Sequence, residues 1–178
     1  MEYITESMLR SYSVDRSWME KASINIQKTA APGVKTIFLS HSHEDEELIN
    51  GFINYLAALG IKIYVDWQDS DMPRATNRQT AEKIKGQIAK DDFFLVLATK
   101  NALNSRWVPW EIGVADQIKG PYGKIGIIPV VDETGQFKGN EYLQLYKRIT
   151  LDEVFKNRIK LYEAGSHQAK SFSDWLTE

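Results

Sequence analysis

The sequence contains no cysteine, few histidines and no long apolar run, and each absence excludes a class of protein. Without cysteine there is no disulfide framework, zinc finger, iron–sulfur site or thiol nucleophile. The 3 histidines are too few for most histidine-based metal centres. No stretch approaches the roughly 18 apolar residues of a membrane span, and residues 1–10 lack the apolar core of a signal peptide. We therefore expect a cytoplasmic protein without a catalytic metal.

Charge of neither sign dominates. Lys and Arg total 22 against 24 Asp and Glu, a net charge of -2, so the concentrated basic surface that nucleic acids or anionic membranes require is not expected. Hydrophobic residues make up 43% and charged residues 26%, as in an ordinary soluble domain. A chain of 178 residues fits one domain with short extensions.

From residue 35 onward, short apolar runs alternate with helical patterns. Strands are expected over residues 36–40, 61–65, 93–97, 125–128 and 148–151, with helices between them. Apolar runs without alternation are typical of strands buried on both faces, and strands that alternate with helices predict a mostly parallel α/β sheet. Pro129 is expected to limit the fourth strand.

Both ends of the chain are expected to be helical. Residues 1–33 carry a loose apolar pattern that predicts one or two helices and then a breaking linker. This extension either packs on the domain or makes an oligomer contact. At the other end, one helix after Asp152 is expected from the spacing of Val154, Phe155, Ile159 and Tyr162, and a last helix from Phe172, Trp175 and Leu176. Residues 156–178 are expected to form a helical segment that packs on the domain.

Glu111 is the most informative residue for function. It falls inside the apolar stripe of the helix that is expected to run to about Lys119, four residues after Trp107 and three before Val114. Its side chain should point to the core or to a cleft beside it, where an ionised carboxylate is costly without a partner. It is therefore a candidate functional group. The alternatives are an ion pair with Arg106 or a side chain that reaches solvent.

Three loops follow the carboxyl ends of expected strands, which is where open α/β sheets bind ligands. They cover residues 40–45, 66–77 and 99–105. The second is longer than the roughly 2–6 residues usual for a β–α connection. Within it, Trp67 can stack on a base and Arg74 can pair with a phosphate, although an ordinary surface loop is the alternative.

The first of these loops partly matches a metal motif. Its residues His41, His43 and Asp45 resemble part of an HxHxDH metal motif, but Glu46 replaces the last histidine. A helix start capped by Ser42 is therefore the better interpretation.

Three segments, taken in order, resemble the TIR (Toll/interleukin-1 receptor) domain of the bacterial type. They are residues 37–45 (IFLSHSHED), residues 63–66 (IYVD) and residues 105–112 (SRWVPWEI). In the last segment Ser105, Trp107 and Glu111 match the family's S-x-W-x-x-x-E helix start. The resemblance covers residues 34–155. It implies a flavodoxin-like, three-layer fold with a five-stranded, mostly parallel sheet in the order 2-1-3-4-5.

The resemblance also implies an activity. Enzymatic TIR domains cleave NAD at the nicotinamide–ribose bond with the glutamate of this motif, which is Glu111. NAD is then the substrate, and no cofactor is expected. Residues 66–77 correspond to the BB loop, which gates the site and meets neighbouring subunits. One departure is that His41 and His43 stand where many TIR domains carry Arg or Tyr. Substrate contacts are expected from Ser40, His41, Asp66, Trp67, Arg74, Ser105 and Trp107.

The extensions are too short for a sensor domain, so the chain is expected to be a stand-alone TIR protein. Such proteins resemble the signal-making component of Thoeris-like antiphage systems, in which a cyclic ADP-ribose-type messenger activates a separate effector. One alternative is a non-enzymatic adaptor that signals by assembly, although an adaptor needs no carboxylate at Glu111. Another is a secreted virulence protein that interferes with host signalling, for which the N-terminus gives no support.

Overall fold

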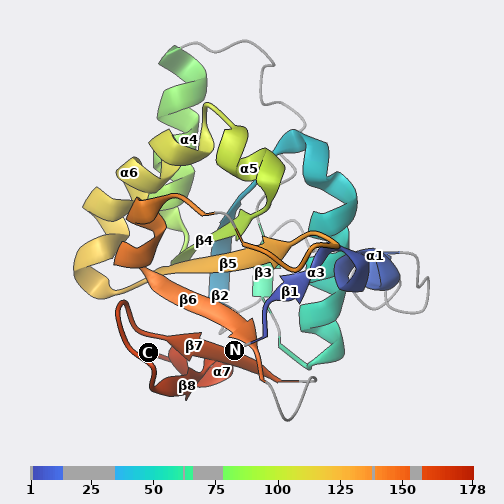
Figure 1. Ribbon diagram of the computed structural model, residues 1–178. Helices are drawn as coiled ribbons and strands as arrows, with labels where there is room; N and C mark the ends of the chain where they lie inside the picture. Colours follow the sequence, from blue (N-terminus) through green and yellow to red (C-terminus); the bar gives the residue numbers. More distant parts are fainter. Residues whose placement is uncertain (1, 14–34, 62, 66–77, 138, 153–157) are drawn as a thin grey trace.

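Five parallel strands form the centre of the sheet (Figure 1). The computed structural model describes residues 2–13, 35–61, 63–65, 78–137, 139–152 and 158–178. The five strands are β2 (Lys35–Ser40), β3 (Ile63–Val65), β4 (Phe93–Ala98), β5 (Ile125–Val131) and β6 (Lys147–Leu151). Their order is β3-β2-β4-β5-β6, and each neighbouring pair is parallel. Counted along the chain this is the expected order 2-1-3-4-5, so the flavodoxin-like arrangement is confirmed.

Helices cover both faces of this sheet (Figure 1). One face carries α1 (Glu6–Ser13) and α3 (Glu46–Ala58), and the other carries α4 (Arg78–Lys90) and α6 (Val108–Lys119). Shorter helical elements are η1 (His43–Asp45), α5 (Lys100–Asn104), η2 (Gly120–Tyr122), η3 (Glu141–Leu145) and α7 (Phe172–Trp175). No helix in the described ranges is both long and apolar enough to span a membrane.

Strand β4 shows why the central runs lack polar alternation. All six of its residues are buried. Its odd-numbered positions, such as Phe93 and Leu95, pack in the cluster with α3, and its even-numbered positions, such as Phe94 and Val96, pack in the cluster with α4 and α6. Because successive side chains point to opposite faces, a strand covered on both sides must be apolar throughout.

The N-terminal extension is not simply helical, which corrects the sequence-based expectation. Before α1, the chain forms β1 (Ile4–Thr5), which pairs in parallel with Val130 and Val131 of β5. Ile4 is fully buried there. Helix α1 then packs closely on α3, since a Cβ added at Gly51 would lie 2.0 Å from the carbonyl oxygen of Leu9. This part of the extension belongs to the domain core; residues 14–34 lie outside the described ranges.

The C-terminal segment also differs from the expected two helices. Residues 159–162 form β7 (Ile159–Tyr162), which runs antiparallel to β6, and β8 (Ala169–Ser171) pairs antiparallel to β7. In β7 buried Ile159 and Leu161 alternate with less buried neighbours, and this period of two prevails over the helical spacing. Val154 and Phe155 lie outside the described residues. The short helix expected near Trp175 is confirmed as α7.

Two further strands and β1 therefore enlarge the five-stranded sheet to eight strands in the described part of the chain. Pro129 does not end β5, which continues to Val131. It falls between the stretch of β5 that pairs with β6, at residues 126–127, and the stretch that pairs with β1, at residues 130–131. On the edge of β5 that β6 and β1 share, Pro129 therefore lies between the two pairings. Its missing N–H is tolerated because neither β6 nor β1 requires a ladder hydrogen bond from that residue.

Candidate active site

The site is centred on a hydrogen bond between Ser40 and Glu111. Ser40 is the last residue of β2, and its side chain follows Phe38 toward the face covered by α6. Its hydroxyl donates to Oε2 of Glu111, in the first turn of α6, at 2.5 Å. Both residues are buried, with Ser40 1% and Glu111 8% exposed. The expected inward direction of Glu111 is thus confirmed, and its partner is a serine instead of Arg106.

The start of α6 positions this carboxylate. The hydroxyl of Ser105 accepts hydrogen bonds from the backbone N–H groups of Trp107 at 3.2 Å and Val108 at 3.4 Å, which satisfies two donors at the helix entrance. Pro109 lies in the first turn, where its missing N–H costs nothing. The N–H of Glu111 bonds the carbonyl of Trp107 at 2.8 Å. Ser105 therefore caps the start of α6 by accepting these two hydrogen bonds.

Burial changes the acidity of Glu111. Removal from water disfavours the charged form and raises the pKa of Glu111 to about 7, although the hydrogen bond from Ser40 acts in the opposite direction. Within the described residues no Lys, Arg or His side chain forms an ion pair with it. The carboxylate therefore titrates close to neutral pH and depends on a single hydroxyl for its stabilisation.

His41 follows Ser40 directly and is held by the backbone. Its Nδ1 lies 2.6 Å from the carbonyl oxygen of Leu39, so this nitrogen carries the proton and donates. Burial lowers the pKa of His41, and the nearby His43 adds to this effect. The ring is neutral at neutral pH, and its plane is nearly perpendicular to that of His43.

A second buried carboxylate, Asp45, joins two of the loops at this edge of the sheet. It accepts hydrogen bonds from the hydroxyl of Thr99 and, at 2.8 Å, from Nδ2 of Asn101. Thr99 also caps α5 by accepting from the N–H of Ala102 at 3.0 Å. The sequence predicts both loops at the carboxyl edge, but it indicates only a helix start for Asp45. The signal was available, because polar residues in loops after adjacent parallel strands are brought together.

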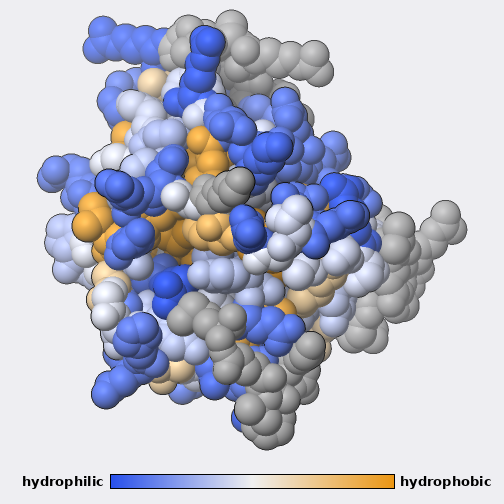
Figure 2. Space-filling model, in the orientation of Figure 1, coloured by the Kyte–Doolittle hydropathy of each residue, from blue (hydrophilic) through white to orange (hydrophobic). Residues whose placement is uncertain are grey.

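The two tryptophans of the motif come just before Glu111 in the sequence, at the start of α6. Trp107 and Trp110 are partly buried against the α4–α6 cluster, and their ring centroids are 5.2 Å apart at an interplanar angle of 79°. Figure 2 shows apolar surface in the region of α6 on a face that is otherwise mostly hydrophilic. This edge-to-face pair places two aromatic rings at the start of α6, the helix that carries Glu111.

Three expected substrate contacts, Asp66, Trp67 and Arg74, lie outside the described residues, as does the whole BB loop over residues 66–77. Of the other four, Ser40 donates to the carboxylate of Glu111, and His41 follows Ser40 in the chain. Ser105 caps the start of α6, and the carbonyl of Trp107 accepts from the N–H of Glu111. Among the described residues, no group of three His, Asp or Glu side chains is arranged to hold a metal ion. The groups gathered at this edge are the carboxylates of Glu111 and Asp45, hydroxyls, a neutral imidazole and indoles.

Two features define the class of protein. They are the parallel sheet in the order 2-1-3-4-5 and the buried glutamate at the start of α6, the long helix between β4 and β5. The TIR domain family matches residues 37–160. The chain belongs to this family.

Two relatives carry names that describe an activity. A protein of Bacillus cereus (strain MSX-D12) named "Probable 3' cyclic ADP-D-ribose synthase ThsB'" is 32% identical over 168 residues, which cover 90% of this chain and 83% of the relative. A protein of Cytobacillus dafuensis named "Putative cyclic ADP-D-ribose synthase TIR2" is 31% identical over 88 residues, or 48% of this chain and 23% of that protein.

Proposed function

We propose that this chain cleaves NAD at the bond between nicotinamide and ribose, giving nicotinamide and a cyclic ADP-ribose-type product that signals in antiphage defence. The observation that carries the proposal is the buried carboxylate of Glu111, held by Ser40 at the ligand-binding edge of a TIR domain. The names of the two relatives, both cyclic ADP-D-ribose synthases, support the same reaction.

The chemistry suits a single carboxylate. When the bond between ribose C1′ and the pyridinium nitrogen breaks, the electron pair leaves with nicotinamide, which becomes neutral and needs no proton from a general acid. Positive charge develops on the ribose as an oxocarbenium-like centre, as in glycoside cleavage. The ionised carboxylate of Glu111 stabilises that charge and accepts a hydrogen bond from a ribose hydroxyl.

The second step decides the product. An adenine nitrogen or a ribose hydroxyl of the same molecule attacks C1′, which closes a ring. A hydroxyl that attacks passes its proton to the carboxylate of Glu111. Attack by water gives linear ADP-ribose instead. We propose that Trp107 and Trp110, whose rings pack edge to face at the start of α6, exclude water near Glu111 and so favour ring closure. NAD is the substrate in this scheme, and no further cofactor takes part.

The partners follow from the same reaction. A cyclic nucleotide product can leave the site as a messenger, so we propose that a separate effector protein receives it.

The resemblance to TIR domains supports a second proposal, self-association through residues 66–77. Sedimentation of the intact chain with and without NAD tests this, because assembly predicts a larger species than the 20.4 kDa single chain.

Mass spectrometry of NAD incubated with the purified chain tests the reaction. Wild-type protein should release nicotinamide together with a product that has the mass of cyclic ADP-ribose, 18 Da less than linear ADP-ribose because no water is added. Glu111→Gln should produce neither, since glutamine keeps the shape of the side chain but not its charge. Glu82→Gln, on the exposed face of α4, is the matched control and should behave as wild type.

Two outcomes would contradict the proposal. Nicotinamide release by Glu111→Gln at the wild-type rate would remove Glu111 from the mechanism. Intact NAD with wild-type protein, both under crowding that favours assembly and in lysate from phage-infected cells, would instead favour the adaptor function.

A further inference from the structure

Asp45 is a buried carboxylate that connects the loop after β2 with the start of α5. Its side chain accepts from the hydroxyl of Thr99 and, at 2.8 Å, from Nδ2 of Asn101. Asp45 is 2% exposed and Thr99 is 1% exposed. The ladder between β2 and β4 ends with the pair Ser40 and Val96. The contact of Asp45 therefore joins the two chain segments beyond the end of their ladder.

A tight turn ties Asp45 to the residue that holds Glu111. Asp45 follows Ser40 by five residues, and its N–H donates to the carbonyl of Ser42 at 3.0 Å. The hydroxyl of Ser42 accepts from the N–H of Glu44 at 3.3 Å within the same turn. Because the backbone has only two soft torsions per residue, so short a turn absorbs little displacement, and a shift of Asp45 also shifts Ser40.

The other side of the contact leads to Glu111. Thr99 caps α5 by accepting from the N–H of Ala102, and α5 ends where the N–H of Ser105 bonds the carbonyl of Ala102 at 3.2 Å. Ser105 in turn caps α6, whose first turn carries Glu111. Since the hydroxyl of Ser40 bonds Glu111, the contacts of Asp45 complete a ring of linked segments that contains the Ser40–Glu111 hydrogen bond.

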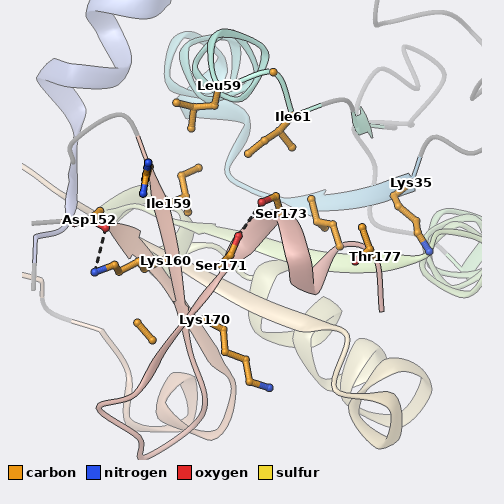
Figure 3. Close-up of a pocket in the computed structure, with 14 residues that line it drawn as sticks. Lys35, Leu59, Ile61, Asp152, Ile159, Lys160, Lys170, Ser171, Ser173 and Thr177 are labelled. Carbon is orange, nitrogen blue, oxygen red and sulfur yellow. Dashed lines mark hydrogen bonds and ion pairs between the residues drawn. The ribbon is translucent and has the colours of Figure 1, made fainter. Parts of the chain in front are cut away.

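Burial distinguishes Asp45 from acidic residues that join elements elsewhere. At the pocket between the end of α3 and β7, β8 and α7, Asp152 pairs with Lys160 at 3.1 Å (Figure 3), and nearby Lys170 pairs with Glu163 at 3.5 Å. These two lysine side chains are 36% and 57% exposed, and ion pairs open to solvent hold a geometry only weakly. Loss of a bond to Asp45 would instead leave buried polar atoms unpaired, which is costly.

We propose that Asp45 is a positioning residue for NAD cleavage, which holds the hydroxyl of Ser40 in place against Glu111. It does so through its hydrogen bonds to Thr99 and Asn101. A hydrogen bond weakens steeply as its geometry departs from the optimum, and a misplacement of about 1 Å can cost a catalytic group much of its effect. The inference rests on the proposed function, since position affects the rate only if Glu111 acts on NAD.

The charge of Asp45 would act differently from its hydrogen bonds. Removing a nearby negative charge favours ionisation of Glu111 and lowers its pKa, whereas loosening the bond from Ser40 raises that pKa. His41 is not an intermediary. Burial lowers the pKa of His41 and the charge of Asp45 opposes this, so the ring stays neutral when that charge is lost. The direction of the change at Glu111 therefore separates positioning from electrostatics.

Carbon-13 NMR titration of the Glu111 carboxyl group, assigned with Glu111→Gln, tests this together with the rate of nicotinamide release at pH 8. Asp45→Asn keeps the size of the side chain but turns an amide N–H toward one of the two donors. Asn101→Ala removes one bond at a partly buried position. Glu44→Gln is the charge-matched control, since Glu44 is an exposed carboxylate in the same turn.

Asp45→Asn should raise the pKa of Glu111 by about 0.5 or more. It should lower kcat roughly tenfold with little change in KM for NAD, because the affected group acts in the transition state. Asn101→Ala should change both quantities in the same direction, and Glu44→Gln should match wild type. In the Ser40→Ala background, Asp45→Asn should add no further change, since no hydroxyl is left to position.

The assignment is overturned if Asp45→Asn leaves the pKa of Glu111 unchanged or lowers it, if Glu44→Gln raises it equally, or if Asp45→Asn raises it further in the Ser40→Ala background. If Asp45→Asn does not fold, Asn101→Ala decides by the same criteria. Wild-type protein that leaves NAD intact would remove the proposed function, and the titration would still decide whether Asp45 positions Ser40.

Discussion

Replacing Glu111 by glutamine is expected to stabilise the fold at alkaline pH and to change it little at acid pH. Burial raises the pKa of Glu111 from 4.5 to about 7. In the unfolded chain the carboxyl group ionises near 4.5, whereas the folded chain holds its proton until about pH 7. Over that interval the folded state binds more protons, so wild-type stability falls as pH rises from about 4.5 to about 7 and is then constant.

The magnitude follows from the two pKa values. One pKa unit corresponds to roughly 1.4 kcal/mol, so ionised Glu111 costs the folded state about 3 kcal/mol above pH 7. Glutamine carries no charge, and its amide oxygen can still accept from the hydroxyl of Ser40. The variant should therefore be about 3 kcal/mol more stable than wild type at pH 8.5 but no more than about 1 kcal/mol more stable at pH 5.

Urea unfolding followed by circular dichroism at pH 5 and pH 8.5 measures both differences. Glu82→Gln, at an exposed position, should follow wild type at both pH values. Equal stability of wild type and Glu111→Gln at pH 8.5 would refute the reasoning, because it would mean that the carboxylate is ionised in the fold at no cost.

Three other predictions concern the surroundings of the site and the core. Ser40→Ala removes the hydrogen bond that lowers the pKa of Glu111, so the rise of kcat/KM with pH should move to higher pH and Ser40→Thr should restore it. Gly51→Ala should cost about 2 kcal/mol or more in urea unfolding, since its Cβ would overlap the backbone of Leu9, whereas Gly86→Ala, with open space on α4, should gain about 0.5–1 kcal/mol. Dialysis against EDTA should leave NAD cleavage unchanged, and loss of activity that added Mg²⁺ or Zn²⁺ restores would contradict a reaction carried by side chains alone.

The central sheet could be predicted because its strands are short apolar runs that alternate with helical patterns. The run from Phe93 to Leu97 is apolar at every position, and so short a run is typical of a strand covered on both faces. The prediction that Pro129 limits the fourth expected strand was wrong, because the strand that pairs beyond this proline comes from a distant part of the chain. Whether a proline ends a strand depends on which neighbour its missing N–H would face, and β1, which pairs just beyond it, comes from the N-terminus.

Edge elements were harder to predict than the centre. Residues 159–162 fit helical spacing and strand alternation equally well over so short a stretch, and pairing with β6 decides between them. The burial of Glu111 could be predicted from its place in the apolar stripe of α6. Its partner Ser40 could not, because the contact joins residues 71 positions apart and depends on how α6 crosses the end of β2.

The rate at which nicotinamide is released from NAD at pH 8, measured for folded wild-type protein and for Glu111→Gln, tests the central claim most directly. The account predicts steady release by wild type and a rate roughly 10²–10³-fold lower for the variant, as when a group that stabilises transition-state charge is lost. Equal rates for the two proteins, with both shown to be folded by circular dichroism, would contradict the assignment of the cleavage to the carboxylate of Glu111.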